Sequence, residues 1–291
     1  MVNPAKLVAA GFLLAEAPTF DAVGNLWVAD TLGGGIRVLA ADGGECRILT
    51  ERRGIGGMAL HAGGDMLVSG RDVVAVGLGS GPAGEPSATV RSVLVDPHAT
   101  GFNDLGAGPG GELLCGVLTY RPLRGDPPVQ GRLRVVTGAT DHHDIDGEVW
   151  WPNGVAVDAG WLYLSDFATG SILRAGWADG SRLQPWWSSP SGQADGLAVD
   201  ASGAVLVALG RGGGVARVLP DGTMDAVIDV PASFVASVCF AGPDLDRLIV
   251  TTADNTDDPA LGGCVFELDA TVPGATVPRV SAPIMSGLEE Q

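Results

Sequence analysis

The sequence predicts an all-β fold, a single six-bladed β-propeller domain covering residues 1–291. A turn containing Gly, Asp or Asn, followed by a short apolar strand, recurs six times along the chain. A further strand-like segment follows each copy, and several of these end in an Asp-Gly turn that suits a hairpin. No region shows the 3.6-residue periodicity of an amphipathic helix. A repeat of this length built only from short strands is typical of four-stranded propeller blades.

The six units are evenly spaced along the chain. The apolar residues that begin their first strand segments recur every 40 to 49 positions, as Leu26, Met66, Leu113, Leu162, Val205 and Leu248. The following segments lie at 34–44, 71–81, 131–140, 170–180, 213–222 and 263–270. The 45 glycines suit a chain with many tight turns, because glycine reaches positive φ without a steric penalty. Two packed β-sandwiches, the alternative architecture, would not explain this regular spacing.

The charge balance argues against several classes of partner. Lys and Arg total 17 against 34 Asp and Glu, which gives a net charge of −17. Such a chain repels phosphate backbones and anionic lipids, so we expect neither a nucleic acid nor a membrane as partner. No apolar run reaches the roughly 18 residues of a transmembrane helix. The expected partner is a small-molecule substrate.

Cysteine usage and the N-terminal segment bear on the cellular compartment. The four cysteines form no Cys-x-x-Cys pair, and most lie in apolar strand-like runs, as expected for reduced core residues of a cytoplasmic protein. They are Cys46, Cys115, Cys239 and Cys264. Lys6, the apolar run after it and Ala-Glu-Ala at 15–17 imitate a secretory signal with a cleavage site. Cleavage there would remove or expose Glu16, a candidate ligand, so we expect a cytoplasmic location.

Four polar residues occupy one position relative to the apolar strand of their unit, nine or ten residues before it. They are Glu16, Asn103, Asn153 and Asp195, in the first, third, fourth and fifth units. The inner strands of a propeller surround a central channel, and the loops at one end of it form a concave site. We therefore expect these side chains, just before the inner strands, to converge there. The second unit has Gly56–Gly57 at this position, so it contributes space instead of a ligand.

Two carboxylates and two amide oxygens form a set of oxygen ligands without His or Cys. Calcium accepts six to eight oxygens in loose geometry; magnesium and manganese are alternatives, whereas zinc prefers nitrogen or sulfur. Without a cation, Glu16 and Asp195 would repel each other across a narrow channel. The structural alternative is that Asn-Gly at 153–154 and Asp-Gly at 195–196 are turn dipeptides that begin strands.

The ordered motifs resemble the senescence-marker-protein/gluconolactonase family, also called regucalcin-like, over residues 10 to 270. The motifs are Glu-x-Pro at 16–18, Phe-Asn-Asp at 102–104, Asn-Gly at 153–154 and Asp-Gly at 195–196. The resemblance implies a divalent metal, usually calcium, held by Glu16, Asn153 and Asp195. It also implies that Asn103 helps to hold the metal or the substrate, and that Asp195 is the general base. The implied activity is hydrolysis of a lactone or small ester, with the metal polarising the carbonyl.

The sequence departs from the sugar-lactonase pattern at two places. Sugar-binding members often carry Arg two residues before the Asn of Phe-Asn-Asp, where this chain has Gly101. Such members also contact the sugar with a Glu just past the third inner strand, where this chain has Tyr120 and Arg121. We therefore predict a less sugar-like, anionic or hydrophobic lactone or ester. Arg121 would contact a carboxylate, and Trp151 would add an apolar wall to a substrate site that includes Asn103 and Tyr120.

Two other functions remain open. A metal that polarises a carbonyl also acidifies the neighbouring carbon, so a lyase, dehydratase or cyclase is possible with Asp195 as the base. A non-catalytic metal-binding propeller is the third hypothesis. A serine hydrolase is not indicated, because no Gly-x-Ser-x-Gly elbow is present.

Other polar residues are assigned supporting roles. We expect Asp30 and Asp166 to hydrogen-bond neighbouring backbone, and Asp104 to orient its loop or a metal-bound water. His142 and His143 fall on an outer strand or loop, and adjacent strand residues face opposite sides of a sheet. They are therefore not expected to bind a metal together.

Overall fold

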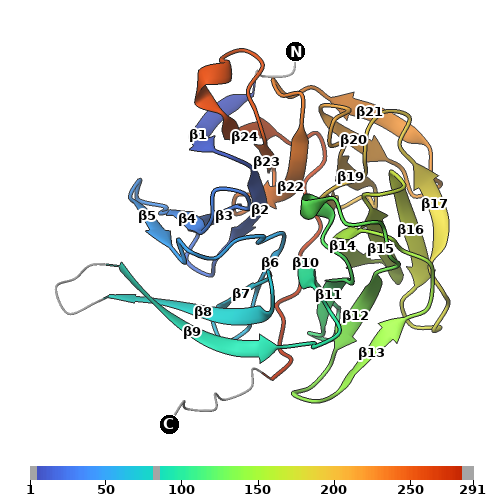
Figure 1. Cartoon of the computed structure of the whole chain (residues 1–291). Coiled ribbons are helices and arrows are strands. Elements are labelled where there is room, and N and C mark those ends of the chain that lie inside the picture. The colour runs from blue at the N-terminus through green and yellow to red at the C-terminus, as the bar shows by residue number, and fades with distance from the viewer. Residues whose placement is uncertain (1–4, 81–85, 284–291) are drawn as a thin grey trace, which may run out of the picture.

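In a computed structural model, which describes residues 5–80 and 86–283, the chain forms six four-stranded antiparallel sheets around a common centre (Figure 1). This arrangement confirms the predicted six-bladed β-propeller. Within the described ranges the only helical segments are two single 3₁₀ turns, η1 (Pro122–Arg124) and η2 (Pro259–Leu261). No helix among the described residues is long and apolar enough to cross a membrane.

Blades 1 to 5 each use four strands that follow one another in the chain and are ordered outward from the centre. Blades 1 and 2 comprise β2 (Ala15–Phe20), β3 (Leu26–Asp30), β4 (Ile36–Leu39) and β5 (Glu45–Ile48), then β6 (Met58–Leu60), β7 (Met66–Val68), β8 (Val73–Ser80) and β9 (Pro86–Leu94). Blade 3 comprises β10 (Gly101–Ala107), β11 (Leu113–Leu118), β12 (Arg132–Val136) and β13 (His142–Ile145). Blades 4 and 5 comprise β14 (Pro152–Asp158), β15 (Trp161–Asp166), β16 (Ser171–Gly176) and β17 (Gln184–Ser188), then β18 (Leu197–Val199), β19 (Val205–Ala208), β20 (Val215–Val218) and β21 (Met224–Ile228).

Blade 6 joins the two ends of the chain. Its inner strands are β22 (Val235–Ala241), β23 (Arg247–Thr252) and β24 (Gly263–Asp269), and its outermost strand is β1 (Lys6–Phe12). β1 pairs antiparallel with β24, from Lys6 opposite Glu267 to Phe12 opposite Gly263. The apolar run that imitates a signal peptide therefore forms the strand that closes the circle of blades. The repeat pattern does not predict this closure, because β1 precedes the first unit.

One assignment from the sequence was wrong. The six apolar marker residues begin the second strand of each blade, β3, β7, β11, β15, β19 and β23, or lie one residue into it. The innermost strands are β2, β6, β10, β14, β18 and β22. Consequently Glu16, Asn103 and Asn153 lie within innermost strands and not in loops before them, and Asp195 lies two residues before β18.

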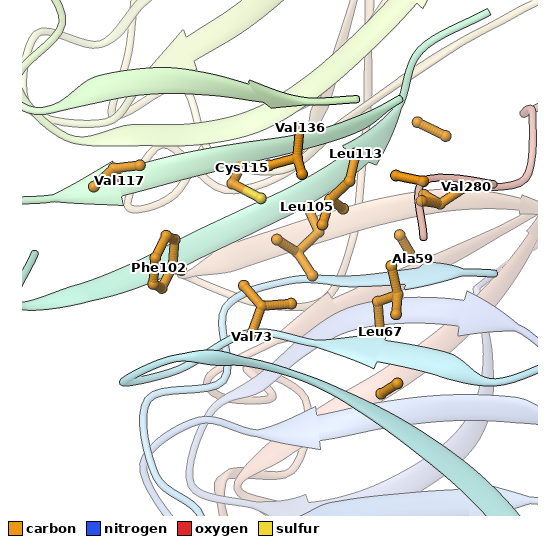
Figure 2. Close-up of a cluster of buried hydrophobic side chains, with 13 residues drawn as sticks. Ala59, Leu67, Val73, Phe102, Leu105, Leu113, Cys115, Val117, Val136 and Val280 are labelled. Atoms are coloured by element: carbon orange, nitrogen blue, oxygen red, sulfur yellow. The ribbon is translucent and has the colours of Figure 1, made fainter. Parts of the chain in front are cut away.

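Apolar side chains fill the wedges between neighbouring blades. Strand side chains alternate between the two faces of a sheet, so each face of a blade can pack against its neighbour. Six buried clusters result among the described residues, one at each blade interface. Figure 2 shows the cluster between blades 2 and 3, where Phe102 and Leu113 meet Leu67 and Val73. Val280, from the C-terminal segment, completes this cluster.

The C-terminal segment crosses one end of the central channel (Figure 1). The Ala275 amide donates to the carbonyl of Val199 at the end of β18, at 2.9 Å, and the Val280 amide donates to Leu60 at the end of β6, at 3.0 Å. These contacts tie blade 5 to blade 2 across the channel. They lie at the opposite end of the innermost strands from Glu16 and its counterparts.

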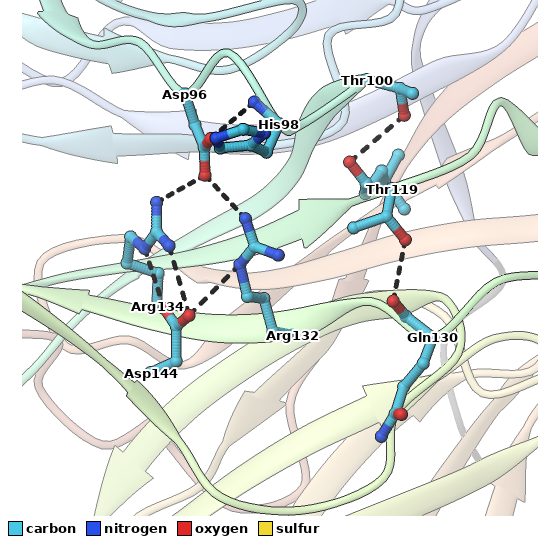
Figure 3. A network of polar contacts seen from close by, with 9 residues as sticks. Asp96, His98, Thr100, Thr119, Gln130, Arg132, Arg134 and Asp144 are labelled. Carbon is cyan, nitrogen blue, oxygen red and sulfur yellow. Dashed lines mark hydrogen bonds and ion pairs between the residues drawn. The ribbon is translucent and has the colours of Figure 1, made fainter.

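An ion-pair network anchors the linker that leads into β10 (Figure 3). Asp96 in this linker accepts from Arg132 Nη2 at 2.6 Å and from Arg134 Nη1 at 2.7 Å, and Asp144 on β13 accepts from Arg134 Nε at 2.8 Å. Burial alone would raise the pKa of Asp96, but hydrogen bonds from the His98 amide and both arginines lower it to about 2. The linker is thereby held against the outer strands of blade 3.

Glycines allow neighbouring innermost strands to approach closely. A Cβ on Gly154 of β14 would lie 2.4 Å from the Leu197 backbone nitrogen in the next blade. A Cβ on Gly57 would lie 2.2 Å from the Leu105 backbone nitrogen of β10. Both distances are far below van der Waals contact, so any side chain at these positions would push adjacent blades apart.

We predict that Gly154→Ala destabilises the protein by about 1–3 kcal/mol, because the added methyl must displace the backbone of β18. Urea unfolding would measure the change. Gly44→Ala is the matched control, since its Cβ would meet nothing closer than 3.4 Å in the β4–β5 turn. Equal stabilities for the two variants would contradict the proposed close approach.

Candidate active site

Three innermost strands carry one extra residue where the predicted site residues lie. Glu16 of β2 pairs with Ala29, but Thr19 pairs with Trp27, so three steps along β2 match two along β3. The same mismatch follows Phe102 in β10 and Pro152 in β14. Such β-bulges bend a strand and re-aim its side chains.

The bulge in β2 includes a strained residue. Ala17, directly after Glu16, has a φ of 51°, in the left-handed region that non-glycine residues rarely occupy. Strained backbone of this kind is concentrated at functional sites. The bulge in β2 therefore holds Glu16 in a conformation that a regular strand would not provide.

The bulged strands bring the four predicted residues together at one end of the channel. Asn103 Nδ2 donates to the carbonyl of Pro152 at 2.9 Å, directly before Asn153. Both the Asn153 side chain and the charge of Glu16 influence the pKa of Asp195, so these residues lie close to it. We call these residues, together with Asp104, the ring.

The second blade provides space in the ring, as the sequence suggested. A Cβ on Gly56 would lie 2.1 Å from Asn103 Oδ1, so only glycine admits the Asn103 side chain. Blade 6 contributes Ser237, which lies close to Gly196: a Cβ on Gly196 would be 2.1 Å from its hydroxyl oxygen.

Asp104 belongs to the ring itself, which is closer to the site than the supporting role expected of it, the orientation of its loop or of a metal-bound water. Its charge acts on both Glu16 and Asp195. Burial raises its own pKa to about 8. In a regular strand Asp104 would face away from Asn103, and the bulge in β10 removes that alternation. The adjacent Asn-Asp pair was the only sequence signal, and it is weak without the bulge.

The ring concentrates negative charge. Burial, followed by repulsion from Asp104, raises the pKa of Glu16. Burial, followed by repulsion from Glu16 and then Asp104, raises the pKa of Asp195, and hydrogen bonds from Asn153 and the Gly196 amide partly oppose this shift. The ring therefore favours protons or a cation over three ionised carboxylates.

The residues present fit a hard cation. Asp195 Oδ1 is buried and accepts no hydrogen bond. A buried carboxylate oxygen without a partner is costly unless it binds a cation or a proton. In the part of the chain that the structure describes, no three His, Cys, Asp or Glu side chains form a metal site by themselves. A cation here would therefore also need the amide oxygens of Asn153 or Asn103, or water.

Trp151 lies on an aromatic ledge beside the ring. Its ring centroid is 4.5 Å from that of Phe167, which lies 6.4 Å from that of Phe234 in blade 6. The Arg211 guanidinium lies over Phe234, 5.9 Å from the ring centroid. Trp151 Nε1 is buried without a hydrogen-bond partner. Phe167, Phe234 and Arg211 were not predicted, because each lies in a loop without a motif.

Asp166 positions this ledge. Its carboxylate accepts from the backbone amides of Trp150 at 3.1 Å and Trp151 at 2.9 Å. Asp30 does the same for Leu13 and Leu14 before β2. The expected role of both aspartates, hydrogen bonding to neighbouring backbone, is confirmed. His142 and His143 are exposed on β13, the outermost strand of blade 3, as expected.

Tyr120 and Arg121 line a groove of about 540 Å³ on another side of this end of the propeller. Tyr120 is buried, and burial followed by the charge of Asp166 raises its pKa. Arg121 is exposed, and its Nε donates to Asp126 at 2.7 Å. The structure thus places Tyr120 and Arg121 in the groove and Trp151 on the ledge, and none of the three belongs to the ring.

On its inner side, the ring borders a cavity of about 440 Å³ within the channel. The innermost strands of all six blades line it, and Asp104 is the ring carboxylate among its lining residues. Residues 275–279 of the C-terminal segment also line this cavity.

Comparisons with known proteins find one family and several similar proteins. A family model described as SMP-30/Gluconolactonase/LRE-like region matches residues 14–254. The pentonolactonase XacC of Haloferax volcanii is 32% identical over 203 residues, 63% of this chain and 67% of its own. A 6-deoxy-6-sulfogluconolactonase of Pseudomonas putida is 28% identical over 91% of this chain and 94% of its own. The crystal structure of a calcium-binding protein, regucalcin, from Agrobacterium tumefaciens has a TM-score of 0.76 at 23% identity, covering 96% of this chain and 97% of its own.

We predict that chelator-treated protein loses stability as the pH rises from about 4 to about 8. Unfolded carboxyl groups ionise near pH 4, whereas the raised pKa values of Glu16, Asp195 and Asp104, the last about 8, keep protons bound in the folded state. The folded state thus binds more protons across this window, and that advantage disappears as the pH rises. Thermal unfolding at several pH values would measure the slope.

In the same experiment Asp104→Asn should flatten the slope and raise the unfolding temperature at pH 8. Asp42→Asn, an exposed carboxylate in the β4–β5 turn, is the control and should keep the wild-type slope. A wild-type slope in Asp104→Asn would show that the three carboxyl groups do not interact as described.

Proposed function

Because the chain belongs to the SMP-30/gluconolactonase/LRE-like family, we propose that it is a metal-dependent lactone hydrolase that acts at the ring. The observation that carries the proposal is the buried Asp195 Oδ1, which has no partner and lies among two further carboxylates and two amide side chains. Two relatives with lactonase names, similar over about two thirds or more of the chain's length, support the reaction class.

Glu16, Asn153 and Asp195 would hold the metal, and calcium is the ion that their oxygen donors suit best. When bound, it would supply a Lewis acid that polarises the lactone carbonyl and stabilises the developing oxyanion. Magnesium, manganese and zinc are alternatives, zinc the least suited to oxygen donors. The calcium-binding fold relative is consistent with this assignment.

Asp195 is the proposed general base. Its carboxylate would lie beside the metal-polarised carbonyl, where it would accept a proton from the attacking water. The water oxygen bonds to the carbonyl carbon of the lactone, and the bond between that carbon and the endocyclic oxygen of the lactone breaks. This endocyclic oxygen takes up the proton from Asp195, which yields a hydroxy acid. Asn103, fixed by its bond to Pro152, would orient the substrate or the water.

The substrate is proposed to be a small lactone that is less sugar-like than gluconolactone, with Trp151, Tyr120 and Arg121 in contact with it. At Gly101 a Cβ would lie 3.0 Å from the Gly70 carbonyl oxygen, so the arginine of sugar-binding members would strain this approach of blades 2 and 3. The Pseudomonas putida relative carries a sulfo-substituted gluconolactone in its name, which is consistent with an anionic substrate.

We propose a reducing, cytoplasmic location because the four cysteines are free.

We predict that Asp195→Asn and Glu16→Gln each lower kcat/KM for lactone hydrolysis by about 100-fold or more, because each removes a charge from the ring. Both variants should also lose the calcium-dependent rise in unfolding temperature, which is a readout independent of activity. Glu45→Gln on the outermost strand of blade 1 is the control and should behave as wild type. Wild-type activity in Glu16→Gln would remove this residue from the site.

Isotope uptake separates hydrolysis from the lyase, dehydratase or cyclase alternative. In ¹⁸O-enriched water a lactonase adds one labelled oxygen to its hydroxy-acid product, because the attacking oxygen comes from solvent. Mass spectrometry of the product would detect it. Turnover without label would replace the proposed hydrolysis by elimination chemistry, and a calcium-dependent melting shift without any turnover would leave a binding propeller.

A comparison of gluconolactone with aryl and alkyl lactones tests the substrate. A clear preference for gluconolactone would contradict the proposal of a less sugar-like substrate.

A further inference from the structure

We propose that the groove between blades 2 and 3 binds an anionic substituent of the substrate through Arg71 and Arg121. The inference rests on the proposed lactone hydrolysis and narrows its substrate to lactones with a carboxylate, sulfonate or phosphate away from the reacting carbonyl. Arg71 has no role in any motif of the sequence.

Three segments form the groove of about 540 Å³. They are Arg71 in the β7–β8 turn, residues 99–100 before β10, and parts of the 119–129 loop between β11 and β12. The 119–129 loop is anchored at its start, because Thr100 Oγ1 donates to the Tyr120 carbonyl at 2.6 Å. The groove is therefore built from segments that are hydrogen-bonded to one another.

A backbone bridge connects the groove to the ring. Gly70 forms an isolated antiparallel bridge with Phe102, and the Phe102 amide donates to the Gly70 carbonyl at 2.7 Å. Arg71 directly follows Gly70, and Asn103 of the ring directly follows Phe102. One backbone bridge thus links the arginine of the groove to a residue of the reaction site. A small lactone held at the ring can extend a substituent into the groove.

The groove is positively charged in a strongly acidic protein. Its lining contains two guanidinium groups, Arg71 and Arg121, against the single carboxylate of Asp126. Most arginines in the described ranges form ion pairs, but Arg71 is exposed and forms neither an ion pair nor a hydrogen bond there. The net charge of −17 repels anions from most of the surface, so a local excess of positive charge would attract an anionic substrate to this groove.

Arg121 is held in place for binding. Its Nε donates to Asp126 at 2.7 Å, and its backbone amide donates to the same carboxylate oxygen at 3.1 Å. The side chain is still 55% exposed, so donors remain available to a ligand. A guanidinium fixed by a neighbouring carboxylate loses less conformational entropy when it binds an anion. Arg121 and Arg71 together can contact the two or three oxygens of one anionic group.

The test compares matched lactones. Steady-state rates would be measured for a γ-butyrolactone with a carboxylate substituent and for the same lactone with a carboxamide in its place. We expect a kcat/KM ratio of at least tenfold in favour of the carboxylate in wild type. Sulfonate and phosphate analogues identify the preferred anion, and each should also exceed the carboxamide if the groove recognises negative charge.

Arg71→Gln and Arg121→Gln should each lower the carboxylate-to-carboxamide ratio about tenfold. The matched control is Arg53→Gln, an exposed arginine at the same end of the propeller that does not line the groove. It should keep the ratio within about twofold. A wild-type ratio near one, or an equal fall in Arg71→Gln and Arg53→Gln, would overturn the proposal.

Binding separates this proposal from the proposed reaction. If wild type hydrolyses neither lactone, calorimetric titration with the carboxylate and carboxamide compounds still tests the groove. Tighter binding of the carboxylate that Arg71→Gln weakens would keep the groove as an anion site and overturn only the hydrolysis. Equal binding of the two compounds, or none, would overturn the groove.

Discussion

The ladder between β1 and β24 is the constraint on which the rest of the structure depends. Each blade buries its two faces only against its neighbours, so a propeller that was not closed would leave two apolar blade faces in water. The pairing of residues 6–12 with 263–269 closes the circle and completes the clusters on both sides of blade 6. Closure also determines the site, because Glu16 comes from blade 1 and Asp195 from blade 5, on either side of the closing blade.

Once the circle of six blades is closed, the radius of the central channel depends on backbone contacts between the innermost strands. Gly57, Gly154 and Gly196 lie where these contacts are closest, and each is next to a ring position or occupies one. The dipeptides Asn153–Gly154 and Asp195–Gly196 thus serve two purposes: the first residue supplies an oxygen to the ring, and the glycine lets the next blade approach. The β-bulges add the local bend that separates these residues from the regular alternation of the strand.

The close approach has an electrostatic consequence. Three carboxyl groups share a small volume: burial raises the pKa values of all three, and repulsion from neighbouring carboxylates further raises those of Glu16 and Asp195. This arrangement lowers the stability of the folded protein and increases the affinity of the site for positive charge. Such unfavourable arrangements are common at functional sites. The groove beside the ring carries positive charge instead, because Arg71 and Arg121 line it. The proposed metal would neutralise the ring, and a neutral centre next to a basic groove would suit a substrate with a polarisable carbonyl and a separate negative charge.

The sequence by itself determined the six repeats, the all-β class, and Glu16, Asn103, Asn153 and Asp195 as one set, because repeat spacing is a local property that survives without coordinates. It also indicated that Gly56–Gly57 leaves space. The tertiary structure decided what depends on contacts between distant segments. It showed that β1 closes the last blade, that the marker strands are second from the centre, and that a bulge turns Asp104 into the ring. It also brought Arg71 beside Arg121, although 50 residues separate them, because the Gly70–Phe102 bridge joins two blades.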